Sequence, residues 1–353
     1  MPNKITVLLM ALVMGWALSA EPSAHQTRGM QMGVFMEGWD RPAAAPAVKS
    51  LGLGWIRVMY DWPWLEPSRG QIDWASFDRG MARAKAQNLK VLVVVQGSPA
   101  WANGGRGDNE KTPPLPEFYG LFANYVAEMV RHGADAVEIW NEPNSAFWLP
   151  APDPKTWAKL VVASYDAVKA VNPKTPVITG GVCPVDQGSL SSNSPANFLQ
   201  AALEAVPEFG RKFDGVGHHP YVFADDPAAK DPLTAPYQYN AIWQTREMQK
   251  VLAKYGDGDK PFWFTEYGVP TGGPFGAVPP ERSGEIYQHY FDAFDQLAAG
   301  GIKLGPMFFW TLKDSPHYRK ANMMEGWEGV FDADDRPKPS VEVIRARAAQ
   351  TVN

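Results

Sequence analysis

Eight short runs of apolar, β-prone residues recur along the chain, separated by longer stretches of mixed polarity. The runs cover residues 31–35, 55–60, 91–96, 136–140, 177–180, 215–219, 262–265 and 306–310. Several of the intervening stretches repeat apolar positions at helical spacing, namely residues 118–132, 154–171, 239–255 and 284–299. Apolar strands that alternate with helices predict a parallel sheet with helices packed against it.

We expect this α/β pattern to form a closed (β/α)8 TIM barrel. An open doubly wound sheet more often has a glycine-rich phosphate loop after its first strand, but Met36-Glu37-Gly38-Trp39-Asp40 follows the first run here. No change of composition divides the chain, so residues 21–353 are predicted to be one domain. Long loops rich in glycine, proline, serine and asparagine follow the fifth, sixth and seventh runs, at residues 184–197, 223–236 and 268–280. In this fold such loops build the active site.

Composition narrows the possible functions. The 353 residues are 45% hydrophobic and 20% charged, with a net charge of -5, which argues against disorder, a membrane bundle and a nucleic-acid partner. The 14 tryptophans are more than a core usually needs, and flat aromatic faces stack well on sugar rings.

The N-terminal segment has the pattern of a signal peptide. Lys4 precedes an apolar run over residues 5–18, and small residues end at Ala20. A buried helix or a membrane anchor is the alternative, but the run is shorter than the roughly 20 residues that span a bilayer. We therefore expect residues 1–20 to be removed, leaving a secreted or periplasmic monomer with no membrane span. Cys183 is the only cysteine, so no intrachain disulfide can form, and we interpret it as a small buried apolar residue.

The fourth run ends in Glu138-Ile139-Trp140-Asn141-Glu142-Pro143-Asn144. Pro143 stops the strand ladder, so Glu142 is expected at the mouth of the barrel, where a carboxylate beside aromatic surface has a functional purpose. Asparagine and proline also favour turns, so a simple turn cluster explains this motif equally well.

A second carboxylate, Glu266, ends the seventh run in Phe262-Trp263-Phe264-Thr265-Glu266-Tyr267-Gly268. Alone it could be a salt-bridged surface residue, but glutamates ending strands four and seven face each other across a barrel mouth. Glycoside hydrolysis needs such a pair, because one carboxyl protonates the leaving oxygen while the other attacks or stabilises the anomeric carbon. Their mutual repulsion keeps one of them protonated near neutral pH.

On these two motifs the chain resembles clan A of the glycoside hydrolases, the barrel enzymes whose catalytic pair lies on strands four and seven. The ending from Gly329-Val330-Phe331-Asp332 to Arg336-Pro337-Lys338-Pro339 is also common in such barrels. The chain looks most similar to family 39 and related bacterial exopolysaccharide hydrolases, and next to family 5. Family 5 members often have a histidine after strand three, where this chain has Gln96-Gly97-Ser98-Pro99.

The resemblance implies that Glu142 is the acid/base, that Glu266 is the nucleophile, and that Asn141 contacts the sugar 2-hydroxyl. It also assigns the site residues Arg57, His219, Tyr221 and Trp310.

In such enzymes an arginine at the end of strand two, here Arg57, holds the nucleophile ionised, unless it forms only a surface ion pair. His219 and Tyr221 match a His-x-Tyr pattern whose tyrosine bonds the nucleophile, with ordinary barrel packing as the alternative. His218 is expected to point the opposite way along its strand, so no metal site with His219 is predicted. Trp310 is expected to stack under the scissile sugar rather than serve only as core.

Further tryptophans follow strand ends and could line sugar subsites, or could equally pack the rim: Trp39, Trp62, Trp64, Trp101 and Trp148. Together these tryptophans suggest a cleft, which favours endo action. With the glutamate pair on strands four and seven we expect a retaining, endo-acting β-glycosidase that cuts a polysaccharide or oligosaccharide without cofactor or metal. The alternatives are an exo-acting enzyme similar to β-xylosidases and a non-catalytic carbohydrate-binding barrel.

Overall fold

Eight parallel strands form one sheet in the order β5-β4-β3-β2-β1-β8-β7-β6. A computed structural model describes residues 31–185, 191–274 and 276–350. Two parallel bridges, Ile178 with Gly215 and Val182 with His218, join β5 to β6 and close the ring. The predicted TIM barrel is confirmed. The strands are β1 Met32–Phe35, β2 Trp55–Met59, β3 Lys90–Val95, β4 Ala136–Asn141, β5 Val177–Gly181, β6 Val216–His218, β7 Phe262–Phe264 and β8 Leu304–Phe309.

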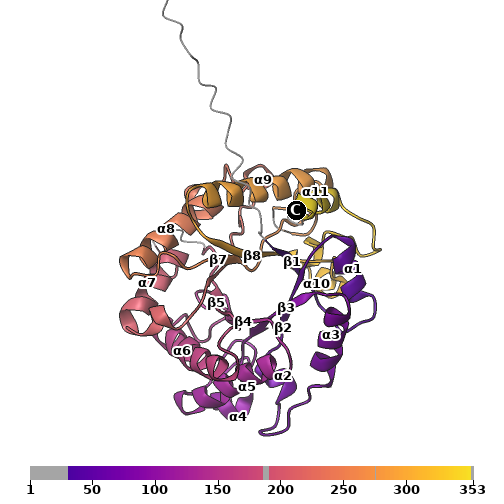
Figure 1. The fold of residues 1–353 in the computed structure, drawn as a ribbon. Coiled ribbons are helices and arrows are strands. Elements are labelled where there is room, and N and C mark those ends of the chain that lie inside the picture. Colours follow the sequence, from indigo (N-terminus) through magenta and orange to yellow (C-terminus); the bar gives the residue numbers. More distant parts are fainter. Residues whose placement is uncertain (1–30, 186–190, 275, 351–353) are drawn as a thin grey trace, which may run out of the picture.

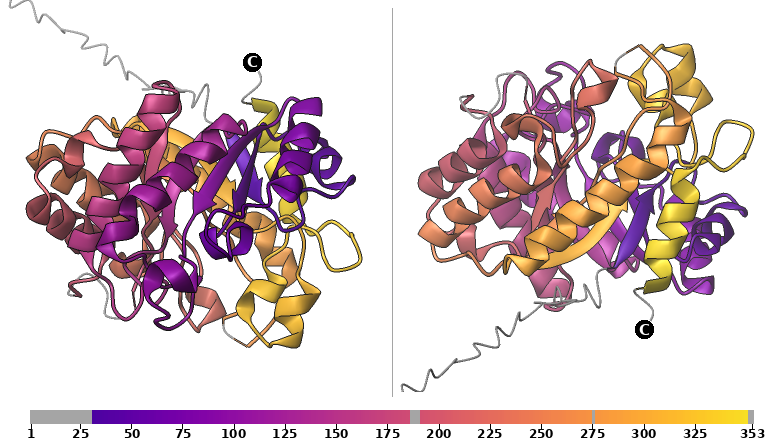
Figure 2. Two further views of the ribbon diagram at one scale, coloured as in Figure 1. Left: turned by 90° about the horizontal axis from the view of Figure 1, so that it is seen from below. Right: turned by 90° about the horizontal axis from the view of Figure 1, so that it is seen from above.

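Helices surround the strands on every side (Figure 1). One longer helix follows each strand: α1 Ala44–Ser50, α3 Ala75–Ala86, α5 Tyr119–Arg131, α6 Pro154–Val171, α7 Pro195–Ala205, α8 Ala241–Lys254, α9 Pro280–Ala299 and α11 Ser340–Gln350. Three short helices lie in the loops after β2, β3 and β8: α2 Trp62–Leu65, α4 Ala100–Asn103 and α10 Pro316–Lys320. Figure 2 shows α10 at one end of the barrel and α11 running beside α9 on its outside. The loop helices therefore belong to the end where the strands finish.

A compact aromatic layer fills the amino-terminal half of the barrel interior. It is made of Trp55, Leu92, Ala136, Ile178, Trp263 and Phe308. Glycine leaves room for these rings, because a Cβ on Gly33 would lie 2.6 Å from the ring of Phe308. Arg57 and Glu138 each lie two residues further along their strands and are fully buried. The floor of the barrel is therefore apolar, and the next layer above it contains the charged side chains of Arg57 and Glu138.

Two expectations fall on residues that are not described, namely the signal peptide at residues 1–20 and positions 186–190 of the loop after β5. Within the described ranges, no helix is long and apolar enough to cross a membrane.

Candidate active site

The end of β4 presents Glu142 on an unusual stretch of backbone. Trp140 and Glu142 have φ angles of 77° and 45°, a region that non-glycine residues rarely adopt and that costs about 1–3 kcal/mol for each. The amide of Glu142 donates to the carbonyl of Gly181 (3.1 Å), and the side chain of Asn144 donates to the carbonyl of Cys183 (2.7 Å). Turn-forming residues thus tie the strained segment to β5, while the glutamate projects from it.

Glu266 follows directly after β7 and is held by two donors. Arg57 Nη1 donates to its Oε1 (2.6 Å), and the hydroxyl of Tyr221 donates to its Oε2 (3.0 Å). Only 6% of Glu266 is exposed. Both donors favour the ionised carboxylate.

Arg57 connects the charged groups below the mouth. It lies in the middle of β2 rather than at the end of the strand. From there its Nε donates to Glu138 (2.9 Å) and its Nη2 donates to Asn141 Oδ1 (3.0 Å). Burial lowers the pKa of Arg57, but Glu138 and Glu266 together raise it above its ordinary value. The guanidinium therefore stays charged and fixes three acceptors at once.

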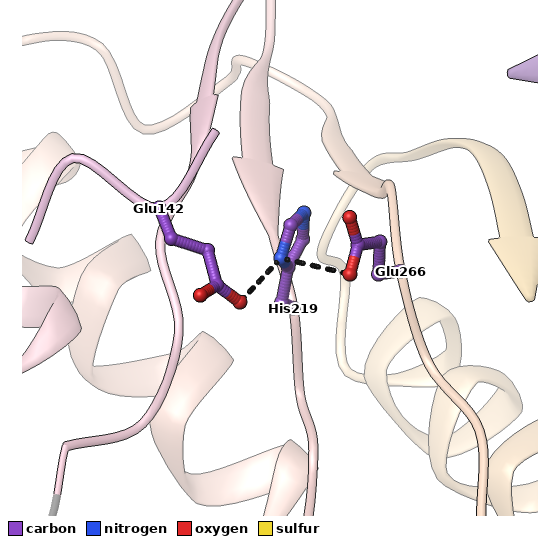
Figure 3. A group of neighbouring side chains, drawn as sticks. All are labelled: Glu142, His219 and Glu266. Carbon is purple, nitrogen blue, oxygen red and sulfur yellow. Dashed lines mark hydrogen bonds and ion pairs between the residues drawn. The ribbon is translucent and has the colours of Figure 1, made fainter. Parts of the chain in front are cut away.

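His219 lies between the two glutamates (Figure 3). Its Nδ1 is 3.0 Å from Glu142 Oε1 and 3.6 Å from Glu266 Oε2, while its Nε2 is 3.0 Å from Thr265 Oγ1. His218 instead bonds side chains of α8, on the opposite face of β6, as strand alternation predicts.

Burial and neighbouring charges favour a single proton on the pair formed by Glu142 and Glu266. Burial raises the pKa of Glu142 to about 8, and the negative charge of Glu266 contributes to this shift. Burial also raises the pKa of Glu266, but Arg57 and Tyr221 oppose it. Burial lowers the pKa of His219 well below its usual value, and the charge of Arg57 adds to this, so the imidazole is neutral. The site thus combines a protonated Glu142 with an ionised Glu266.

Glu142, His219 and Glu266 also offer three ligand atoms within 4.8 Å of one another, a spacing that suits a metal ion. However, the Arg57 guanidinium lies 2.6 Å from Glu266 and would repel a cation. A protonated Glu142 would also be a weak ligand. The donor set suits proton transfer and nucleophilic attack better than metal binding.

Trp310 follows β8, and its ring stacks on Phe35 with 3.9 Å between centroids. Both rings line a cavity of about 360 Å³ between the loops after β1 and β8, together with Glu37, Tyr318 and Glu325. The two catalytic candidates do not line this cavity. The backbone amide of Trp310 donates to the carbonyl of Tyr267, the residue after Glu266 (2.8 Å), so the ends of β8 and β7 are joined beside the nucleophile candidate.

We expect Trp310→Ala to raise KM and lower kcat/KM while shifting Tm by only a few degrees. The ring is partly exposed, so its removal loses contact with sugar, whereas a fully buried tryptophan contributes about 3 to 5 kcal/mol to stability. Kinetics and thermal unfolding of the same preparation distinguish the two. The fully buried Trp157 provides the matched comparison, because Trp157→Ala should unfold the protein readily.

Several predicted sugar contacts have a different place in the structure. Only 2% of Trp148 is exposed and its ring packs against Trp140 (4.6 Å between centroids), so it has no open face for a substrate. Arg57 and His219 have no exposed surface, so they act on the glutamates rather than on the sugar.

The remaining tryptophans after strand ends divide into two groups. Trp39 and Trp62 are buried and pack the rim. Trp101 is partly exposed, whereas half of Trp64 is exposed and its Nε1 donates to Glu110 (2.8 Å). Trp64 and Trp101 are therefore the two that can still offer surface to a sugar chain.

The sequence interpretation gave no role to Glu138 or Thr265 and considered Cys183 only as a buried apolar residue. Glu138 Oε1 accepts from the amide of Gly181 (2.9 Å) and from the hydroxyl of Thr265 (2.8 Å). Cys183 is buried, as expected, and its thiol also contacts Glu142, where it partly offsets the rise that burial causes in the pKa of that carboxyl. A charged residue inside an otherwise apolar strand was the available signal for Glu138.

Solved structures of two glycoside hydrolase families share this architecture. A family 39 enzyme from Bacteroides cellulosilyticus is 20% identical, with a TM-score of 0.68, over 91% of this chain and 64% of that one. A monomeric β-xylosidase from Caulobacter crescentus is 18% identical, with a TM-score of 0.64, over 91% and 67%. A GH5_18 protein from Streptomyces cattleya is 20% identical, with a TM-score of 0.68, over 93% and 82%. The chain thus spans about two thirds of the length of the family 39 proteins, and these likenesses establish the fold.

No curated protein sequence matches the chain. The family model for Cellulase (glycosyl hydrolase family 5) matches residues 18–300, which is most of the chain. Family 5 was the second of the two families suggested by the motifs, and both belong to clan A. The chain is a member of the cellulase family, glycosyl hydrolase family 5.

Proposed function

We propose that this protein is a retaining β-glycosidase that hydrolyses O-glycosidic bonds of a polysaccharide or oligosaccharide. The observation that carries the proposal is the short distance between its glutamates, whose nearest oxygens lie within 4.8 Å. Retaining enzymes hold their carboxyl groups about 5 to 5.5 Å apart, whereas inverting ones need roughly 6.5 to 9.5 Å to admit a water.

In the first step Glu266 bonds to the anomeric carbon while the bond from that carbon to the leaving oxygen breaks. Glu142 gives its proton to the leaving oxygen. In the second step water attacks the same carbon and loses a proton to Glu142. The bond between that carbon and Glu266 breaks, and Glu266 leaves as a carboxylate. Asn141 Oδ1 accepts from Arg57, which fixes the orientation of the amide and leaves its NH₂ group to donate to a sugar hydroxyl.

Endo action is the form we favour, because Trp64 and Trp101 offer aromatic surface after β2 and β3, beyond the cavity at Trp310. Exo action is the second candidate, since similar structures include an exo-β-1,4-mannosidase and β-xylosidases. Product lengths from a polymer distinguish these modes. Action outside the cytoplasm stays a prediction, which N-terminal sequencing of the exported protein would test.

The mechanism predicts that the first-formed product is the β anomer and that a 2-fluoro glycoside labels the peptide containing Glu266. Proton NMR during the first minutes of hydrolysis and mass spectrometry of the digested protein measure these outcomes. Glu266→Ala should stay unlabelled. An α-anomeric first product, or a label on another residue, contradicts the assignment, and a barrel that only binds carbohydrate would show neither hydrolysis nor label.

A further inference from the structure

We propose that Glu138 and Thr265 hold His219 in the tautomer with hydrogen on Nε2, so that Nδ1 accepts the proton of Glu142 in the free enzyme. The inference rests on the proposed function, because it concerns the residue assigned there as acid/base. It follows from a line of buried contacts that joins Glu138 on β4 to Thr265 after β7, Thr265 to His219 after β6, and His219 to Glu142 after β4.

The first link is the contact between Thr265 and Glu138. Glu138 is fully buried, accepts from Arg57 Nε (2.9 Å) and accepts from the amide of Gly181 (2.9 Å). A carboxylate in an ion pair with a guanidinium, as Glu138 is with Arg57, can only accept hydrogen bonds. The hydroxyl of Thr265, 2.8 Å from Glu138 Oε1, must therefore give its only proton to that oxygen. Thr265 Oγ1 can then only accept from its other neighbour.

The second link sets the tautomer. His219 Nε2 lies 3.0 Å from Thr265 Oγ1, which can only accept, so Nε2 carries a hydrogen. His219 is neutral, because burial and the charge of Arg57 lower its pKa. A neutral imidazole has one N–H group, so Nδ1 has a lone pair.

The third link locates the proton of the acid/base. The Nδ1 lone pair lies 3.0 Å from Glu142 Oε1 and 3.6 Å from Glu266 Oε2. A lone pair this close to the oxygens of two carboxyl groups is destabilising unless one of these groups is protonated and donates a hydrogen bond to it. Glu266 accepts from Arg57 and Tyr221, so the hydrogen belongs to Glu142 Oε1 and is donated to Nδ1.

Other titratable groups, on several elements, influence the pKa values of Glu142 and His219. Near Glu142 and His219 these are Arg57 on β2, Cys183 after β5, His218 on β6 and Glu325 in the loop after β8. None of them is altered in the variants below, so their effects are constant across the comparison.

The tautomer matters most after the leaving group has taken the proton. The Glu142 carboxylate then faces a lone pair and gains no hydrogen bond from His219, so it stays basic enough to deprotonate water. The opposite tautomer would donate from Nδ1 to that carboxylate and lower its pKa. His219 and Thr265 are thus positioning residues that keep Glu142 basic.

Thr265→Val removes the acceptor for Nε2 and frees His219 to change tautomer. Using the phenyl β-glycoside that the wild type cleaves fastest, we expect the alkaline limb of the kcat/KM profile to move about one pH unit lower. Thr265→Ser keeps the hydroxyl and should leave the limb in place. An unmoved or raised limb in Thr265→Val, or equal shifts in both variants, would overturn the proposal.

A measurement on the unaltered protein covers the case in which Thr265→Val does not fold. Long-range proton-nitrogen NMR of histidine-labelled protein, with His219 assigned by comparison with His219→Gln, should show a neutral ring protonated at Nε2. A ring protonated at Nδ1 would overturn the tautomer. The spectrum needs no substrate, so it separates failure of this inference from failure of the proposed function.

Discussion

Replacing Glu266 with alanine is expected to lower kcat/KM by about 10⁴-fold or more, because the variant lacks the atom that bonds to the anomeric carbon. The fold should persist. Glu266 lies at the mouth of the barrel, and Arg57 keeps its ion pair with Glu138 when the glutamate is removed. Initial rates on a dinitrophenyl β-glycoside and on a polymer measure the loss, and circular dichroism checks the fold.

Azide provides a sharper test of the same variant. In Glu266→Ala the small anion can enter the vacated space and attack from the side that the carboxylate used, which gives an α-glycosyl azide. Glu281→Ala, an exposed glutamate at the start of α9, is the matched control and should retain full activity. A β-glycosyl azide from Glu266→Ala, or activity within tenfold of wild type, would show that another group is the nucleophile.

The strands of the barrel were predictable because a parallel barrel buries both faces of each strand, which leaves continuous apolar runs in the sequence. Each of the eight predicted runs overlaps one strand of the barrel. The bounds differ most in β8, which begins two residues before the predicted run, while β6 and β7 are the shortest strands, with three residues each. Thr265 and Glu266 follow β7, and His219 follows β6, so both strands leave the ladder where their side chains enter the site.

The helices were predictable only where they are long. Helix α9 begins at Pro280, four residues before the predicted start. Proline is favourable in the first turn of a helix, but it adds nothing to the apolar periodicity on which the prediction was based. Helix α8 begins at Ala241 because the Asn240 side chain accepts the amide of Trp243. The loop helices α2, α4 and α10 have four or five residues, too few to show a period.

The two glutamates were predictable from topology, since the ends of strands in a barrel meet at one mouth. The contacts of Glu138 and Thr265 were not predictable, because apart from each other their partners lie on β2, on β5 and directly after β6, and no local pattern indicates which neighbour they meet. Trp148 follows a strand end like Trp101, yet it packs against Trp140. Sequence position alone does not tell which tryptophan of a loop turns inward.

Glu142→Gln is expected to lose about 10²- to 10⁴-fold in kcat/KM on natural linkages and phenyl glycosides, because an amide cannot protonate the leaving oxygen. Dinitrophenyl glycosides leave without a proton, so their first step should be nearly unaffected. Glutamine keeps the size of the side chain, and Ser145, which bonds the carbonyl of Glu142, still holds the turn. The ratio of the two kcat/KM values in wild type and variant measures the effect.

The pH profile gives this prediction its direction. In the wild type Glu142 must be protonated for the first step, and burial raises its pKa to about 8, so kcat/KM for phenyl glycosides should fall as pH rises through about 8. Glutamine does not titrate, so the variant should lose this limb and keep the acidic one, which reports protonation of Glu266.

Azide should restore turnover of Glu142→Ala with a β-glycosyl azide as product, since it replaces water on the face opposite Glu266. Equal losses on both classes of glycoside, or an alkaline limb that persists in Glu142→Gln, would assign the acid to a different group.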